Sequence, residues 1–375
     1  MLIEVKGIGI PNKGAELMLV AIQQAVGSAI DAVEFASEPY TDYKARARYG
    51  LYQKAWLEVK KRQIGPMANV LPKRLLGRFG IVRDIDVDVI LDASGFAYGD
   101  QWGAYKLKSR LGKHIRSWKK NGKKVVLLPQ AFGPFSSPEI RTEISRVLQH
   151  ADLVFARDQQ SYQYLQEFLP NSTKLILAPD FTNLVTGKVP ASFPQGRYDV
   201  CVIPNNKMIE MQDAASQERY PKFMAQLIEV AQSRGKRPFL LIHEGVKDLK
   251  LAEKINSLLA QPLEILSYED PVEIKGVIGT ADIVISSRFH GLVSALSQGV
   301  PVIATGWSHK YQELLQDYGC PELLVDYRDG NGTDRLRQLC DRQLYEELRR
   351  KIQDNALVQK KKTQEMWQVV LKAIA

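Results

Sequence analysis

The sequence predicts an α/β protein built from two Rossmann-like domains that face each other across a cleft. Three observations support this fold class. The chain has 375 residues, which is more than one hydrophobic core usually serves. Short apolar runs alternate with helix-like stretches along most of its length. The alternation breaks at residues 186–196, TGKVPASFPQG, where two prolines and two glycines indicate a linker.

The linker divides the chain into an N-terminal domain over residues 1–190 and a C-terminal domain over residues 197–340. A long polar helix with a weak apolar face is expected over residues 341–375, and it can cross back onto the first domain. Strands are expected in the first domain at residues 2–5, 87–91, 124–128, 153–156 and 174–178.

Helices are expected between these strands at residues 15–26, 104–120 and 138–150. In the second of them Leu107, Leu111, Ile115 and Trp118 are spaced by 4, 4 and 3 residues, which makes an apolar stripe on a basic helix. The second domain repeats the pattern. Its expected strands are residues 199–203, 238–242, 263–266, 283–285 and 300–304, and its expected helices are residues 220–234, 248–259 and 271–280.

Composition limits the class of protein. Hydrophobic residues make up 45% and charged residues 25% of the chain, as in globular proteins. The three cysteines lie far apart, so neither a disulfide framework nor a zinc site is expected, and a reducing cytoplasm is the expected compartment. Because no apolar run approaches the roughly 18 residues of a membrane-spanning helix, the sequence predicts a soluble protein.

The charge is unevenly distributed. Residues 44–83 contain eleven Lys or Arg and one acid, a balance of 11 − 1 = +10 against +9 for the whole chain. Residues 106–124 add nine cations and no acid. Such a basic face can serve nucleic acid, an anionic membrane surface or a phosphorylated substrate, or it can be a solvated surface. From its charge alone, the stretch at residues 44–83 is a candidate for peripheral contact with the inner face of the membrane, where it would meet a diphosphate-linked lipid carrier. No RNA-recognition, zinc-finger or helix-turn-helix signature is present, so nucleic acid is not an expected partner.

The strongest candidate for a functional site is the turn Ser286-Ser287-Arg288-Phe289-His290-Gly291, which joins an apolar strand to a short amphipathic helix. Parallel α/β sheets bind their ligands above the carboxyl ends of their strands. A helix N-terminus there favours anions, so Ser287 and Arg288 predict a phosphate or carboxylate ligand. His290 adds a titratable ring, although a single histidine is often only a structural group.

Other strand ends carry further candidates. Asn12, Gly14 and Glu16 lie where the first strand meets the first helix, in a glycine-containing turn that lacks dinucleotide-fingerprint spacing and can be a plain tight turn. Gln130 follows another strand and His243 follows a strand of the second domain. These five residues are the candidates for contact with the acceptor or for a place in the cleft.

Arg157 belongs to the same row, at the end of the strand after that of Gln130. Because Asp158 follows it directly, an ordinary structural ion pair is the alternative reading of this arginine.

Taken together, these segments resemble the polysaccharide pyruvyl transferase family. The matching pieces lie in family order over most of the chain, and the segment around Arg288 and His290 is the most specific. They are Asn12-Lys13-Gly14-Ala15-Glu16, LLPQAFGPF at 127–135, ADLVFARDQQSYQYL at 151–165, APDF at 178–181, and SSRFHGLVSALSQGVPVIATG at 286–306 with Lys310.

The resemblance implies an enzyme that transfers the enolpyruvyl carbons of phosphoenolpyruvate to sugar hydroxyls, usually as a cyclic ketal on a glycan. It also implies a fold like the two-domain glycosyltransferase type B (GT-B), with no metal and no cofactor besides the donor substrate. By matching motif, His290 is the general acid or base, Arg288 and Arg157 bind the phosphate and carboxylate of the donor, and Lys310 assists them.

One segment departs from the family pattern. Many members carry a run of glycines after the strand expected at residues 87–91, whereas this chain has Asp92-Ala93-Ser94-Gly95-Phe96-Ala97. The segment is expected to face the acceptor, which is a polysaccharide or its lipid-linked precursor. Two alternatives remain open: a GT-B glycosyltransferase that uses a nucleotide sugar, and a non-catalytic protein that binds anionic glycan or nucleic acid.

Overall fold

The computed structural model describes residues 1–10, 12–38, 41–55, 58–59, 62–63, 65–210 and 215–375. The chain is divided into two compact units. Unit 1 contains residues Met1–Ile10, Met18–Phe181 and Thr363–Ala375, and unit 2 contains residues Pro11–Leu17 and Thr182–Lys362. Among the described residues, no helix has both the length and the apolar character needed to cross a bilayer.

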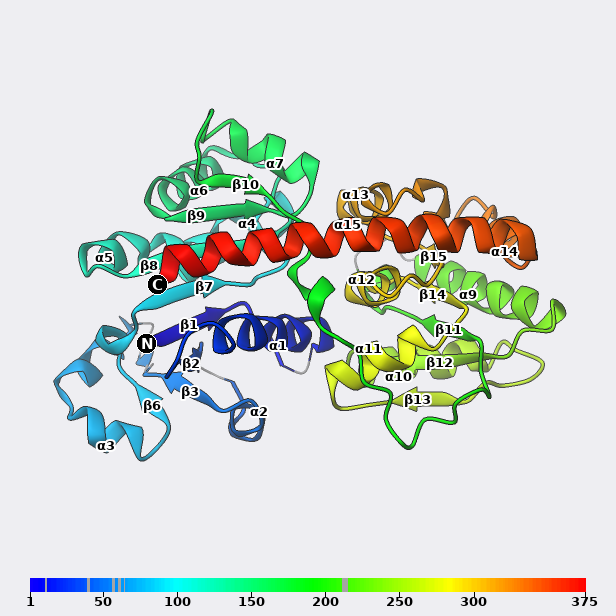
Figure 1. The fold of residues 1–375 in the computed structure, drawn as a ribbon, viewed down its shortest axis with the longest axis horizontal. Coiled ribbons are helices and arrows are strands. Elements are labelled where there is room, and N and C mark those ends of the chain that lie inside the picture. Colours follow the sequence, from blue (N-terminus) through cyan, green and yellow to red (C-terminus); the bar gives the residue numbers. More distant parts are fainter. Residues whose placement is uncertain (11, 39–40, 56–57, 60–61, 64, 211–214) are drawn as a thin grey trace. The chain divides into compact units, whose positions relative to one another are not determined.

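Unit 1 is built on an eight-stranded parallel sheet in the order β10-β9-β8-β7-β1-β2-β3-β6 (Figure 1). The five strands that the sequence predicts here are present. Their bounds are Leu2–Lys6 (β1), Val89–Asp92 (β7), Lys124–Gln130 (β8), Leu153–Ala156 (β9) and Leu175–Leu177 (β10).

Sequence reasoning missed the other three strands of this sheet and a separate two-stranded ribbon. Two of the missed sheet strands mix polar and apolar residues and the third has only two residues, so no apolar run marks them, and pairing with neighbours defines them instead. They are Glu34–Ser37 (β2), Leu51–Lys54 (β3) and Ile81–Val82 (β6), and the ribbon pairs Glu58–Val59 (β4) with Arg62–Gln63 (β5).

The helices of unit 1 include Tyr43–Arg48 (α2), Lys73–Gly77 (α3) and Gln159–Gln166 (α7), besides Pro138–His150 (α6), which has the predicted bounds. Helix α6 is capped by the Ser137 hydroxyl, which accepts a hydrogen bond from the N–H of Ile140.

The single helix predicted over residues 104–120 is interrupted. Gly103–Leu107 (α4) is followed by a π-helical turn over Lys108–Gly112 and then by Ile115–Lys120 (α5). The Lys113 N–H reaches the Lys108 carbonyl at 2.9 Å, which is the i→i+5 bond of a π turn. The four apolar side chains of the predicted stripe are nevertheless all buried in the core of unit 1. The change of helix type therefore does not turn any of them away from the core.

Unit 2 has a five-stranded parallel sheet in the order β13-β12-β11-β14-β15. All five predicted strands are present. They are Val200–Ile203 (β11), Pro238–Ile242 (β12), Ile265–Ser267 (β13), Ile283–Ser286 (β14) and Val302–Ala304 (β15). The predicted α/β class with two parallel sheets is therefore confirmed.

The helices of unit 2 follow the predicted alternation and add several short elements. They are Lys207–Glu210 (α8), Ser216–Ser233 (α9), Gly245–Asn256 (α10), Pro271–Gly279 (α11), Phe289–Leu296 (α12), His309–Asp317 (α13) and Gly332–Leu339 (α14). Two helices contribute residues to both units: Lys13–Gly27 (α1) and the 33-residue Arg342–Ile374 (α15).

Each sheet reverses its strand order once. In unit 1 the reversal lies between β1 and β7, and in unit 2 it lies between β11 and β14. At such a point the loops that leave two adjacent strands diverge, which leaves a crevice above the carboxyl ends of the strands. The reversals therefore select two places to look for a site, and the Ser286–His290 turn begins at one of them.

Candidate functional site

The turn after β14 is held by hydrogen bonds to its own side chains and to neighbouring loops. The Ser286 hydroxyl accepts from the Arg288 N–H at 3.0 Å, and the Asn205 amide donates to the Ser287 carbonyl at 2.8 Å. The Ser287 hydroxyl is buried and lies 2.6 Å from the Tyr220 hydroxyl. Ser287, predicted to bind the donor, therefore contributes its side chain to anchoring the turn at the strand-order reversal.

Arg288 is surrounded by two carboxylates. Its Nη2 atom lies 2.5 Å from both carboxylate oxygens of Asp248, and its Nη1 atom contacts Glu244. Asp248 is fully buried on α10, and burial raises the pKa of its carboxyl, partly offset by the guanidinium. Glu244, at the start of α10, keeps 29% of its side chain exposed. Asp248 thus fixes the guanidinium, and Glu244 is the partner that an incoming anion can replace.

His290 lies in the first turn of α12, directly against the start of α1. A Cβ atom placed on Gly14 would fall 2.4 Å from the Nδ1 atom of His290, so any side chain there would displace the ring. Asn12 lies near Gly14 in the sequence and donates from its amide to Glu244 at 3.0 Å, while its side-chain oxygen caps α1 at the Ala15 N–H. Residues 12–14 therefore contact both the imidazole and a partner of Arg288.

His243 contributes a second imidazole to the same part of unit 2. It follows β12 and is buried. Burial, then the nearby charges of Arg288 and His290, holds the pKa of His243 well below 6.5. This ring is therefore neutral at pH 7 and can act as a hydrogen-bonding group, with no net charge of its own.

Lys310 and Glu16 are each held by neighbours within unit 2. The Lys310 ammonium lies 5.1 to 5.3 Å from the ring centroids of Trp307, Phe289 and Tyr311, a cation–π arrangement next to the 288–290 turn. Glu16 is buried and forms an ion pair of 2.7 Å with Lys13.

Arg157 and Gln130 lie side by side at the carboxyl edge of the sheet of unit 1. The Arg157 N–H donates to the Gln130 carbonyl at 3.0 Å. The Arg157 guanidinium pairs with the buried Asp180 at 3.1 Å, and the Gln130 amide donates to Asp92 at 3.0 Å. Because Arg157 belongs to unit 1 and Arg288 to unit 2, the convergence of the two arginines stays a prediction.

Sequence reasoning named the Asp92–Ala97 segment but overlooked the charged residues that surround it at the strand-order reversal of unit 1. Asp92 accepts from the Ser94 hydroxyl at 2.5 Å, Ser94 accepts from Arg110 at 2.7 Å, and Lys6 pairs with Glu38 at 3.2 Å. The charge at the end of the apolar run LIEVK could have indicated Lys6. Glu38 and Arg110 become neighbours only through the fold, as do Glu244 and Asp248 with Arg288 in unit 2.

Residues 12–309 match the sequence model of a family described as polysaccharide pyruvyl transferase. Among solved structures the chain is similar to a glycosyltransferase from Rickettsia africae ESF-5, with 11% identity, a TM-score of 0.59, and coverage of 100% of this chain and 98% of that one.

Two further solved structures are similar to the chain to the same degree. An Anabaena protein in complex with UDP and glucose shows 12% identity, a TM-score of 0.58 and coverage of 100% and 99% of the two chains. The UDP-GlcNAc 2-epimerase of Methanocaldococcus jannaschii shows 12% identity, a TM-score of 0.56 and coverage of 90% and 91%. At these identities the likeness is one of fold, shared with GT-B glycosyltransferases and UDP-GlcNAc epimerases.

Proposed function

Because the chain belongs to the polysaccharide pyruvyl transferase family, an enzyme family, we propose that it transfers the pyruvyl group of phosphoenolpyruvate to sugar hydroxyls. The acceptor is a surface polysaccharide or its lipid-linked precursor, and the product is a cyclic ketal. The observation that carries the proposal is the turn after β14, which brings Arg288 and His290 together at the strand-order reversal of unit 2.

Phosphoenolpyruvate, the proposed donor substrate, carries a phosphate and a carboxylate, so we expect cationic side chains to bind it. Arg288 offers the planar donor pair that suits either group, and Lys310 adds a second positive charge close to the same turn. Because Glu244 occupies one side of Arg288, donor binding would replace that carboxylate while Asp248 keeps the guanidinium in place. Arg157, which belongs to unit 1, is the proposed third cation that binds the donor.

His290 is the proposed proton-transfer group. Protonation of the donor's methylene carbon creates an oxocarbenium-like centre, which a sugar hydroxyl attacks while losing its own proton. A second hydroxyl of the sugar then closes the ketal as the phosphate leaves. A positioned imidazole typically contributes about 10² to 10⁴ in rate to such proton transfers. Asn12 and Gly14 would act as positioning residues, because they contact Glu244 and His290.

The acceptor is proposed to meet the carboxyl edge of the sheet of unit 1, where Gln130 and Asp92 lie. Glu16 and the neutral His243 are the proposed polar groups that unit 2 adds. We also propose a cytoplasmic location, supported by the free thiols of Cys201, Cys320 and Cys340.

The test is phosphate release from phosphoenolpyruvate in the presence of glycan acceptors. We expect His290→Ala to lower the rate by about 10² to 10⁴. The matched control is His150→Ala on α6, whose ring bonds the Arg146 carbonyl, and this variant should keep full activity. Release of nucleotide from a sugar nucleotide, with phosphoenolpyruvate unchanged, would instead identify a glycosyltransferase.

A further inference from the structure

One surface of unit 1 exposes apolar side chains and cations together. It is formed by helix α3 and its flanking residues, and we call it the α3 surface. Its exposed residues are Met67, Val70, Leu71, Lys73, Arg74, Leu75, Arg78 and Phe79.

Exposure of this degree is unusual for large apolar side chains. Val70 is 84% exposed, Phe79 is 65% exposed and Leu75 is 46% exposed. Burying such groups is the main favourable contribution to folding, so a run of them left in water on a surface indicates an interaction site. The cations around them belong to a stretch, residues 59–83, that contains no Asp or Glu. Asp86 lies just beyond this stretch, and Arg83, helped by the nearby Lys73, lowers the pKa of its carboxyl. The flanking cations Lys60 and Lys61 lie outside the described residues.

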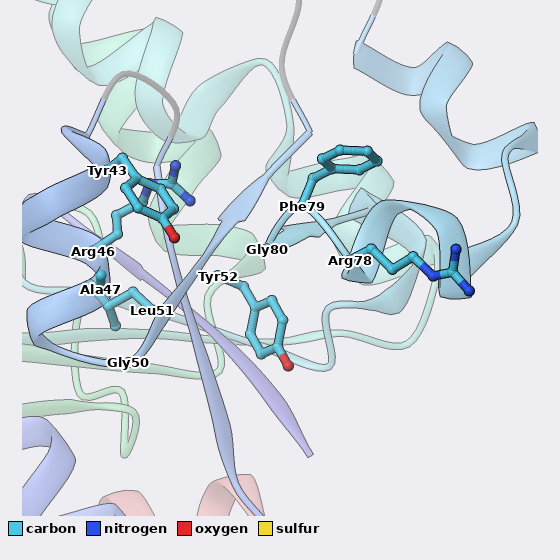
Figure 2. Close-up of a pocket in the computed structure, with 9 residues that line it drawn as sticks. All are labelled: Tyr43, Arg46, Ala47, Gly50, Leu51, Tyr52, Arg78, Phe79 and Gly80. Carbon is cyan, nitrogen blue, oxygen red and sulfur yellow. The ribbon is translucent and has the colours of Figure 1, made fainter.

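A pocket opens beside the α3 surface. Figure 2 shows Tyr43 and Arg46, from α2, on one side and Arg78 and Phe79, which follow α3, on the other, with Tyr52 between them. The cavity has a volume of about 450 Å³.

Arg46 gives this pocket a positive wall. Its side chain is buried, and its Nη1 atom lies 3.9 Å from where a Cβ atom on Gly80 would be, so it reaches from α2 toward the turn before β6. The guanidinium also lies 5.5 Å from the ring of Tyr43. A cation held in this way at the wall of an open cavity suits a phosphate group.

We propose that the α3 surface docks on an anionic lipid bilayer. The aliphatic side chains enter the interface between head groups and acyl chains, the cations lie among lipid phosphates, and one head-group phosphate occupies the pocket beside Arg46. Nucleic acid would also attract the cations. It would not bury Val70, Leu71 and Leu75, whose transfer out of water is favourable. A bilayer therefore explains both the cations and the exposed apolar side chains. The proposal does not depend on the reaction, because docking requires no turnover.

The second basic stretch of the chain provides an internal comparison. In residues 106–124 the cations Lys113, Arg116 and Lys120 are exposed, as those of the α3 surface are. The apolar stripe of that stretch is buried in the core of unit 1. Surface charge without exposed aliphatic side chains should attract a bilayer only weakly and in a salt-dependent way. This stretch therefore supplies a control with equal loss of charge.

The experiment is sedimentation of the full chain with phosphatidylcholine vesicles, with and without phosphatidylglycerol. We expect binding to the anionic vesicles only. The triple variant Lys73→Gln, Arg74→Gln, Arg78→Gln should lose about 100-fold in affinity, since three phosphate-facing cations are removed. The pair Leu75→Ser, Phe79→Ser should lose about 10-fold or more, and Arg46→Gln should lose less. The control Lys113→Gln, Arg116→Gln, Lys120→Gln should bind within about threefold of the parent protein.

Several results would overturn the proposal. They are equal binding to neutral and anionic vesicles, equal losses in the triple variant and its control, or full binding by the Leu75→Ser, Phe79→Ser pair. Inorganic phosphate that releases the protein from vesicles would show that the pocket serves a free anion. Tight binding of an RNA oligonucleotide, with vesicles left unbound, would show a nucleic-acid surface. The substituted side chains other than Arg46 are exposed, so those variants should unfold at the same temperature as the parent protein. Measuring this temperature verifies that each variant is folded.

Discussion

The two units hold their charged side chains in different arrangements. At the strand-order reversal of unit 2, Arg288 lies between a buried and a partly exposed carboxylate, with two imidazoles nearby. In unit 1, Glu4 in the middle of β1 pairs with Lys6 at the end of the same strand and with Lys54 at the end of β3. Glu4 is fully buried there, and both of its oxygens are engaged by Lys6 and Lys54 at 2.9 and 2.8 Å.

The difference separates charges that are all buried and paired from an arrangement in which one partner remains partly exposed. Charges that are buried and mutually paired, as in unit 1, strongly resist exchange, because removing either partner leaves an uncompensated ion. In unit 2 one carboxylate partner of Arg288 keeps contact with solvent, and His290 is held by packing against a glycine. A ligand can therefore compete for the arginine without unfolding the site.

We expect the largest effect from a substitution that breaks the paired charges of unit 1. Burial by itself raises the pKa of Glu4, but Lys6 and Lys54 outweigh it and lower this pKa to about 2. Because the folded-state pKa lies below the ordinary value of 4.5, the stabilisation is present above pH 4.5 and is lost as the pH falls toward 2. Its size is about 3 kcal/mol.

We expect Glu4→Gln to lower the free energy of unfolding by about 3 to 5 kcal/mol at pH 7, since two lysines lose their buried partner. The variant should also lose much of the acid dependence between pH 4.5 and 2. Urea unfolding at several pH values measures both effects, with the exposed Glu139→Gln on α6 as control. A variant as stable as the control at pH 7 would mean that the buried pairs contribute little.

A second prediction disturbs the packing in unit 2. Gly14→Ala places a methyl group where the His290 ring now lies, and the ring must move. Since a misplacement of about 1 Å can cost about 10² in rate, kcat for phosphate release should fall by about 100-fold, with little change in the thermal unfolding temperature.

The matched control for this change is Gly27→Ala at the other end of the same helix, where a Cβ atom meets nothing within 4 Å. It should retain the parent kcat. Similar rates for the two alanine variants would remove Gly14 from the positioning of His290.

The smallest expected effect concerns the exposed partner of Arg288. Glu244→Gln removes a negative charge that competes with an anionic donor and keeps an oxygen for the Asn12 amide. We expect the KM for phosphoenolpyruvate to fall by about 5- to 10-fold, with kcat nearly constant. Initial-rate kinetics measure this, with Glu210→Gln as control, because Glu210 pairs with the surface lysines Lys207 and Lys247 of unit 2. A raised KM would show that Glu244 assists donor binding.

Sequence reasoning worked best where apolar runs were long. It found β9, β12 and α6 with the bounds that the structure has, because periodicity and a serine cap define them locally. It missed β2, β3 and β6, whose residues become strands only by pairing with neighbours. It also expected one continuous helix where a π turn separates α4 from α5, a local change that apolar spacing does not reveal.

The amino-acid sequence by itself determined the α/β class, the family and the position of the Arg288–His290 turn, because these depend on local periodicity and on a contiguous motif. The tertiary structure decided which residues surround that turn. Asn12, Gly14, Glu244 and Asp248 come from distant parts of the chain, and no spacing in the sequence relates them to Arg288. Contacts of this kind arise only when strand order and helix packing bring the separate ends of parallel strands to one edge of a sheet.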